Sequence, residues 1–375
     1  MEGVVFHGKM PDPFLKEDGK RVTPEEWPTY KKALLEKIVD IEYGGMPPRP
    51  EVVEIEPLDG FVRGPFVVWY RIHAGTKEKQ LTFLLGLTIP YDENKGIYYM
   101  APPQEDEKYP VILTGDGCYR NMESDSVAEA TKRGFIAATF NRLELANDIK
   151  GSREGGIHDI YEGDYSDISA WAWGYSVCMD VFEKLSYVDE TEVAITGHSR
   201  GGKTVMLAAA VDERIKYVSP NNSGCHGANS HKCQVLGIPG LRRETETMTH
   251  MLDSVPTWMG PKLEQYRGKP EELPYDMHFF GAMIAPRYYM QCEGMQDYWI
   301  NPVGAWQNFA AVKACYKYLG CEEHAGAWFR PGYHRHKLPE YTEFLNFIER
   351  ARKGLPVAEH LKINPYPDVP LNFDW

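Results

Sequence analysis

The 375-residue sequence lacks three features that would place it in particular classes of protein. No window approaches the run of about 18 apolar residues that a membrane-spanning helix needs. The first ten residues, MEGVVFHGKM, lack the basic region and apolar run of a secretory signal peptide. No block of Lys or Arg is present, and the formal net charge is -13. We therefore expect no membrane association, no nucleic-acid partner and a cytoplasmic location, or a secreted one if a signal peptide has been removed.

Cysteine is also sparse. The seven cysteines are an odd number spread thinly over a long chain. A disulfide framework is typical of small secreted domains that are dense in cysteine. We therefore expect reduced thiols.

A G-x-S-x-G motif at residues 197–201 is the most informative stretch of the sequence. Residues 191–196 read as a short buried strand before the motif, and residues 203–211 (KTVMLAAAV) read as a buried helix after it. This is the setting of a nucleophile elbow, in which a tight strand-to-helix turn lifts a serine hydroxyl into a cleft. Glycines at both ends of the motif leave room for that turn. Ser199 is therefore the predicted nucleophile.

Strands and helices alternate along most of the chain, which indicates a mostly parallel sheet joined by right-handed crossovers. A Thr cap followed by an acid predicts a helix at residues 24–43, and two alternating segments at 66–73 and 80–90 predict antiparallel edge strands. The other predicted strands are at 111–114, 134–140, 191–196, 215–220, 288–292 and 325–329. The other predicted helices are at 167–185, 203–211, 302–319 and 338–352. The predicted fold class is an α/β-hydrolase fold with helices on both faces of the sheet.

The chain length fits a single domain, residues 1–375, with an N-terminal arm and helix at 1–50. Two long stretches, 141–165 and 224–276, are rich in Gly, Pro and charge and show weak periodicity. Long segments of this kind in a compact domain are usually functional. We therefore expect them to be cap loops over the cleft, with 224–276 as the inserted cap.

A serine nucleophile needs a base, and the base needs an orienting acid. In this fold class they follow in the chain order Ser, acid, His, each after a strand. The predicted strand at 288–292 is followed by Glu293 and Asp297, and the one at 325–329 is followed by His334 and His336. The order of strands selects His334 as the base, with His336 as the alternative. It leaves the acid open between the two carboxylates.

Short motifs spread over nearly the whole chain carry a family resemblance. They are PDPF at 11–14, EEW at 25–27, YGGMPPRPE at 43–51, AWAWG at 170–174, S-R-x-G-K at 199–203 and IAPR at 284–287. With these motifs the sequence resembles the glucuronoyl esterase family of carbohydrate esterases, including its relatives that act as acetylxylan esterases. The most specific motif is S-R-x-G-K, because most α/β-hydrolases do not place Arg directly after the nucleophile. Members of the family cleave esters of glucuronic acid on xylan.

The resemblance implies a role for several positions. Ser199 is implied as nucleophile and His334 as base. Arg200 is implied as oxyanion stabiliser, through its backbone N–H and its guanidinium, and Lys203 as a contact to a sugar hydroxyl. The spacing agrees for Lys203, which follows Ser199 by one helical turn.

Two positions depart from the family pattern. Many members carry the catalytic Glu where this chain has Asn222, and the residue before the nucleophile is His198 where the familiar run has Cys. Family members without that Glu resemble this chain in placing an acid after the later strand, where Asp297 stands. The resemblance therefore favours Asp297, with Glu293 as the alternative.

Aromatic residues complete the candidate site. Trp258, Tyr298 and Trp299 lie in or beside the predicted cleft loops, and an aromatic face there can stack on a sugar ring. We expect Trp171 and Trp173, two residues apart in a predicted helix, to lie in the core instead.

One cluster raises the question of a metal. Cys225, His226, His231 and Cys233 lie within nine residues. Zinc sites usually place ligand pairs on separate turns with short spacers, and a hydrolase with Ser, His and Asp needs no metal nucleophile. We therefore expect no metal and no other cofactor.

The sequence as a whole predicts a serine esterase that acts on plant cell-wall carbohydrate. The first hypothesis is a glucuronoyl esterase that works through an acyl-enzyme. The alternatives are an acetylxylan esterase and a carbohydrate-binding pseudoenzyme. In each case the partner is a small-molecule or oligosaccharide ester, and the sequence predicts no oligomeric state.

Overall fold

A computed structural model of the chain describes residues 3–58, 67–90, 107–119, 122–236 and 245–375. The strands within these residues are β1 (Val4–Phe6), β2 (Val52–Leu58), β3 (Val67–Gly75), β4 (Gln80–Thr88), β5 (Tyr109–Thr114), β6 (Ile136–Phe140), β7 (Val188–His198), β8 (Tyr217–Asn221), β9 (Cys233–Val235), β10 (Tyr288–Gly294) and β11 (Ala325–Arg330). The α-helices in the same ranges are α1 (Trp27–Tyr43), α2 (Ser124–Lys132), α3 (Ile157–Ile160), α4 (Asp167–Phe182), α5 (Arg200–Val211), α6 (Met248–Ser254), α7 (His278–Ile284), α8 (Pro302–Tyr318) and α9 (Leu338–Arg352).

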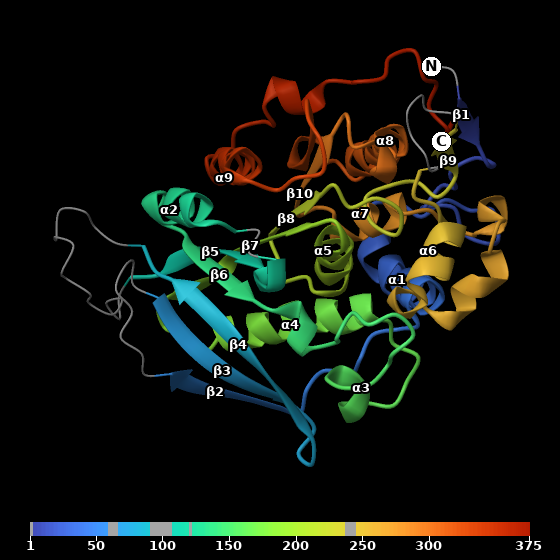
Figure 1. Ribbon diagram of the computed structural model, residues 1–375. Helices are drawn as coiled ribbons and strands as arrows, with labels where there is room; N and C mark the ends of the chain where they lie inside the picture. Colours follow the sequence, from blue (N-terminus) through green and yellow to red (C-terminus); the bar gives the residue numbers. More distant parts are fainter. Residues whose placement is uncertain (1–2, 59–66, 91–106, 120–121, 237–244) are drawn as a thin grey trace.

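The main sheet has nine strands among the described residues, in the order β11-β10-β8-β7-β5-β6-β4-β3-β2 (Figure 1). The strands from β11 to β6 pair in parallel, and β4, β3 and β2 extend the β6 edge as antiparallel neighbours. This arrangement confirms the predicted mostly parallel sheet and the predicted antiparallel edge. Because parallel strands end on the same side, the carboxyl ends of β7, β8, β10 and β11 meet at one edge of the sheet.

Helices cover both faces of the sheet, as predicted for an α/β-hydrolase fold. Helices α2 and α9 pack together on one face, and α4, α5, α7 and α8 lie on the other (Figure 1). Trp171 and Trp173 of α4 are fully buried, and their indole N–H groups donate to the carbonyls of Ala146 and Pro48 at 3.0 and 2.7 Å. Both tryptophans are therefore core residues, as expected.

The first helix begins later than its sequence pattern predicts. Thr23 Oγ1 accepts from the N–H of Glu26, and the Glu26 carboxylate accepts from the N–H of Thr23, at 3.3 and 3.1 Å. The capping pair thus closes a turn of its own, and α1 begins at Trp27.

Other elements were not predicted at all. The segment Ser124–Lys132 is short and polar, and Val52–Leu58 follows a proline-rich connector. The pairing of β1 with β9 joins residues more than 200 positions apart, a contact that no local pattern signals. Residue 66 of the predicted strand at 66–73 lies outside the described residues.

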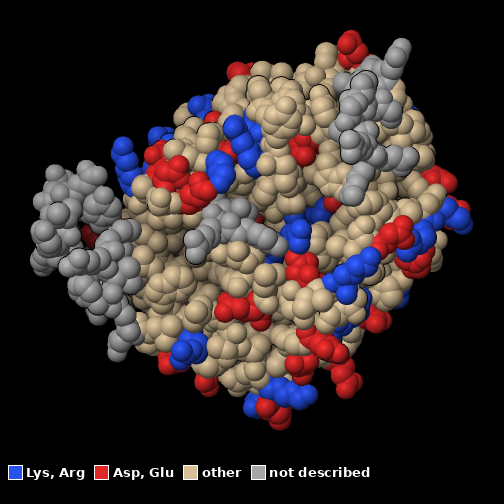
Figure 2. Space-filling view, viewed as in Figure 1, with Lys and Arg blue, Asp and Glu red and all other residues tan. Residues whose placement is uncertain are grey.

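Further expectations concern composition. None of the seven cysteines, all of which are described, forms a disulfide, as expected. In the described part of the chain, no helix is long and apolar enough to cross a membrane. On the face seen in Figure 2, Lys and Arg are interspersed with Asp and Glu over the described residues.

The division into an arm at 1–50 and a cap at 224–276 stays a prediction.

Candidate active site

Ser199 occupies the turn between β7 and α5. Its backbone has φ 56° and ψ -120°, a sparsely populated region for a residue with a side chain. The turn is held by the Ser199 N–H, which donates to the Asn221 carbonyl of β8 at 2.9 Å. A Cβ on Gly197 would come within 2.4 Å of the Gly201 carbonyl oxygen, so the turn requires glycine there. The geometry is that of the predicted elbow.

Asp116, in the loop after β5, contacts the turn between β7 and α5 and stabilises it. One carboxylate oxygen accepts from the backbone N–H of His198 at 2.7 Å, and the other pairs with the guanidinium of Arg142. Both side chains are buried. A Cβ on Gly201 would meet the same carboxylate at 2.2 Å, so the second glycine of the motif is also required. Asp116 and Arg142 were not predicted from the sequence, since neither stands in a recognisable motif.

His334 and Asp297 are brought together by the loops after β11 and β10. His334 Nδ1 lies 2.5 Å from Asp297 Oδ2, and the ring of His334 packs 4.3 Å from the ring of His198, centroid to centroid. The Asp297 side chain is 6% exposed and that of His334 is 38% exposed. The imidazole is thus accessible beside the elbow, while its carboxylate partner is shielded from water.

Asn222 bonds the same oxygen of Asp297 as His334 does. Its Nδ2 donates to Asp297 Oδ2 at 2.7 Å, and its Oδ1 accepts from Arg330 at 3.3 Å. The position at which many family members carry a Glu therefore contacts the acid that this chain places after β10.

The alternative acid and base lie elsewhere. Glu293 is fully buried, and burial raises the pKa of its carboxyl well above the ordinary value. Its Oε1 accepts from Gln291 at 3.1 Å. His336 is buried against the ring of Tyr341, at 4.2 Å between centroids, and burial lowers its pKa well below the ordinary value. The structure therefore pairs Asp297 with His334 and places Glu293 and His336 in the interior.

His198 lies between the elbow and the base. Its Nδ1–H donates to Asn221 Oδ1 at 2.6 Å. Burial, followed by the nearby His334, lowers the pKa of His198 to about 3. The ring is therefore neutral and packs on His334 without adding a charge beside the base.

Arg200 is fixed by residues from both segments that were expected to be cap loops. Its Nη1 donates to Asp148 Oδ2 at 2.5 Å, and its guanidinium carbon lies 4.6 Å from the centroid of the Trp258 ring. The Trp258 indole N–H donates to the other oxygen of Asp148 at 2.8 Å. Trp258 is only 5% exposed, so in this structure it supports Arg200 instead of offering an open face to a sugar.

Lys203 is buried, and its ammonium has an acceptor for each of its three N–H donors. They are the carbonyls of Ser223 and Cys225, at 2.6 and 2.5 Å, and Glu246 Oε2, at 3.0 Å. The ammonium therefore holds Glu246 in place. All three of these bonds go to groups of the protein, so the predicted direct contact of Lys203 with a sugar hydroxyl is not among them. Glu246 was missed because it stands in a stretch without periodicity.

Trp299 lies beside this pair. Its carbonyl accepts from the N–H of Glu246 at 2.7 Å, and its ring meets the His250 ring edge-on at 4.8 Å. Trp299 is half-buried and Tyr298 is 41% exposed, so both keep surface that a ligand can contact.

Comparisons with known proteins identify the family of this chain. The family model described as "Glucuronyl esterase, fungi" matches residues 79–320, more than half of the chain. A 4-O-methyl-glucuronoyl methylesterase from Wolfiporia cocos is 26% identical in an alignment of 344 residues that covers 88% of this chain and 76% of that protein. The carbohydrate esterase MZ0003, from an unknown prokaryotic organism, is 31% identical in an alignment of 252 residues that covers 61% of this chain and 56% of that protein.

Solved structures show the same fold. A carbohydrate esterase family 15 glucuronoyl esterase from Caldicellulosiruptor kristjansonii has a TM-score of 0.81 at 24% identity, with 98% of this chain and 97% of that chain covered. A glucuronoyl esterase variant from Sporotrichum thermophile, in complex with methyl 4-O-methyl-β-D-glucopyranuronate, has a TM-score of 0.76 at 21% identity, with 97% and 94% covered. The chain belongs to the glucuronyl esterase family and is a carboxylic ester hydrolase with the α/β-hydrolase fold.

Proposed function

We propose that this esterase cleaves esters of glucuronic acid, or of its 4-O-methyl ether, in plant cell-wall xylan, through an acyl-enzyme on Ser199. The observation that carries the proposal is the juxtaposition of a strained Ser199 with the His334–Asp297 pair, joined through the packing of His198 on His334. The names of the curated relatives supply the substrate class.

His334 acts as the base in this mechanism. Asp297 holds the Nδ1–H of the imidazole, so the Nε2 lone pair is left to take the proton of the Ser199 hydroxyl. The serine oxygen then adds to the ester carbonyl. When the tetrahedral intermediate collapses, His334 returns the proton to the departing alcohol, and a water molecule repeats the sequence to release the acid.

Arg200 stabilises the oxyanion that forms in each addition. Its backbone N–H stands directly after the nucleophile, and the bond to Asp148 and the contact with Trp258 fix its guanidinium before the substrate arrives. Donors that are already in place cost no reorganisation during the reaction, and removal of one such donor typically costs about 3 to 4 kcal/mol.

Glu246 and Trp299 recognise the sugar. Oε2 of Glu246 accepts from Lys203 and from the backbone N–H of Cys225, so we assign Oε1 to a hydroxyl of the uronic acid ring. The half-buried face of Trp299 is the candidate stacking surface. Lys203 acts indirectly, since it orients Glu246.

Two parallel assays test the proposal, one with a benzyl ester of glucuronic acid and one with an acetylated xylo-oligosaccharide. In the first substrate the sugar supplies the acid, and in the second it supplies the alcohol. We expect hydrolysis of the first at a kcat/KM well above that of the second. Hydrolysis of the acetyl ester alone would indicate an acetylxylan esterase, and sugar binding without hydrolysis of either would indicate a pseudoenzyme.

The cytoplasmic location, or secretion after removal of a signal peptide, stays a prediction.

A further inference from the structure

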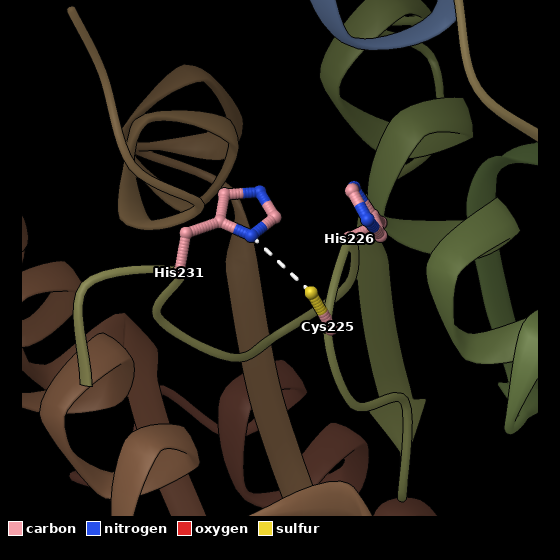
Figure 3. A group of neighbouring side chains, drawn as sticks. All are labelled: Cys225, His226 and His231. Carbon is pink, nitrogen blue, oxygen red and sulfur yellow. Dashed lines mark hydrogen bonds between the residues drawn. The ribbon is translucent and has the colours of Figure 1, made fainter. Parts of the chain in front are cut away.

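The structure has a second cluster of chemically active side chains in addition to the candidate active site. The loop after β8 brings together a cysteine and two histidines. Cys225, His226 and His231 are buried, and their ligand atoms all lie within 4.8 Å of one another (Figure 3). His231 Nδ1 faces Cys225 Sγ at 3.3 Å (Figure 3). The spacing in the sequence argues against a metal site, yet the loop turns back on itself and brings the three side chains together.

Glu42, near the end of α1, contacts both imidazoles. Its Oε1 lies 2.5 Å from His226 Nδ1 and 3.3 Å from His231 Nε2. Tyr275 donates to the other oxygen, Oε2, at 2.6 Å, and so fixes the carboxylate. A carboxylate that accepts one N–H from each ring sets the tautomer of both rings. In the neutral rings, the form that binds a metal, the lone pairs are then on His231 Nδ1 and His226 Nε2.

His226 Nε2 is the second observation that points to a ligand. The residue is fully buried, and within the described part of the chain this nitrogen has no hydrogen-bond partner. Buried nitrogens are nearly always bonded, so an unbonded one calls for an explanation. A metal ion bound at this lone pair supplies one.

We propose that Cys225, His226 and His231 bind one zinc ion, with Glu42 as the carboxylate that orients both histidines. A thiolate and two imidazoles suit zinc and exclude magnesium and calcium, which prefer oxygen ligands. Zinc bonds of about 2.0 to 2.3 Å hold ligand atoms about 3 to 4 Å apart, so a closing movement of about 1 Å brings all three atoms to bonding distance of one ion. Binding releases the thiol proton of Cys225 to solvent.

The ion would stabilise the loop that supports the candidate active site. The carbonyl of Cys225 accepts from Lys203, and its N–H donates to Glu246, while the carbonyl of His226 accepts from the Tyr43 hydroxyl of α1. Zinc would thus fix the loop that positions the Lys203–Glu246 pair, and the bonds of Glu42 to both imidazoles would join that loop to α1. Because the cluster is buried, the metal enters as the chain folds.

Elemental analysis of the full chain, produced in zinc-supplemented medium, tests the proposal. We expect one zinc per chain in the wild type and in Cys315→Ser, a matched control at a buried thiol of α8 outside the cluster. We expect the ion to be lost in Cys225→Ser and in His231→Gln. A zinc content well below one per chain in the wild type, or an ion retained by both cluster variants, would overturn the proposal.

A cobalt-loaded wild type provides a second readout that does not depend on the folding of any variant. Protein produced in cobalt-supplemented medium should show a near-ultraviolet thiolate-to-cobalt charge-transfer band, which reports a cysteine ligand directly. Bound cobalt without this band would contradict the assignment of Cys225 as a ligand.

Discussion

At the scale of single residues, two carboxylates follow one another closely at the end of β10, and their surroundings differ. Asp297 accepts bonds from His334 and Asn222, whereas Glu293 is fully buried and burial raises the pKa of its carboxyl. Asp297→Asn should therefore lower kcat by about 10⁴-fold, because an amide disturbs the imidazole tautomer. Glu293→Gln should change kcat far less, since a glutamine keeps the shape of the side chain and Oε1 of Glu293 bonds to Gln291. A larger loss in Glu293→Gln than in Asp297→Asn, measured on the benzyl ester, would mean that the acid is misassigned.

Asn222 offers a finer test of the same pair. Because its amide holds Asp297 Oδ2 at 2.7 Å, Asn222→Ala should lower kcat about 10-fold while KM changes little, in line with the loss of an orienting contact. Asn222→Glu in the Asp297→Asn background should restore part of the lost rate if the new carboxylate reaches His334. An Asn222→Ala enzyme with wild-type kcat would show that the amide plays no part in positioning.

The buried His198 should make the free energy of unfolding of this protein depend on pH. Its pKa is about 3 in the folded chain and about 6.5 when unfolded, so between these values the unfolded state binds the extra proton. The free energy of unfolding should therefore fall as the pH is lowered from about 6.5, by up to about 1.4 kcal/mol per pH unit from this residue. Urea unfolding between pH 4 and about pH 7 measures the slope. His198→Cys should have a shallower slope, and identical slopes would refute the assignment.

At the scale of elements, the turn between β7 and α5 depends on the buried pair of Asp116 and Arg142. Arg142→Leu should reduce the free energy of unfolding by about 3 to 5 kcal/mol, because it leaves the Asp116 carboxylate buried without that partner. Arg71→Leu is the matched control, since Arg71 pairs with Glu56 at 2.8 Å on the surface, and it should cost at most about 1 kcal/mol. Equal losses in both variants would contradict this account of the turn.

The elements that sequence reasoning found are those with strong local patterns. The elbow strand β7, strands β8, β10 and β11 and helix α9 were predicted close to their observed bounds, since apolar runs and alternation mark them. Helix α2 was missed because its sequence is short and polar, and the pairing of β1 with β9 because it depends on distant contacts.

The residues of the candidate site also fall into those that could be predicted from the sequence and those that could not. Ser199, Asp297 and His334 could be predicted because each follows a recognisable strand in a known order. Asp116, Asp148 and Glu246 could not, because their importance lies in contacts with residues more than 40 positions away, at His198, Arg200 and Lys203. The same reason explains the outcome for Trp258. It was expected to stack on a sugar, and instead its ring packs against the guanidinium of Arg200.

At the scale of the whole molecule, one edge of the sheet collects the parts of the site. The elbow, Asp297 and His334 follow β7, β10 and β11, and the two segments that were expected to be caps reach this edge through Asp148, Trp258 and Glu246. The sheet therefore positions the proposed reacting groups, and those two segments supply the side chains that hold Arg200 and Lys203.

The most direct measurement is the rate at which wild type and Ser199→Ala hydrolyse the benzyl ester of glucuronic acid, with both proteins shown to be folded by circular dichroism. The wild type should turn the ester over. The variant, which lacks the hydroxyl that forms the acyl-enzyme, should be slower by up to about 10⁶-fold. A folded Ser199→Ala protein that keeps a substantial part of the wild-type rate would contradict the mechanism.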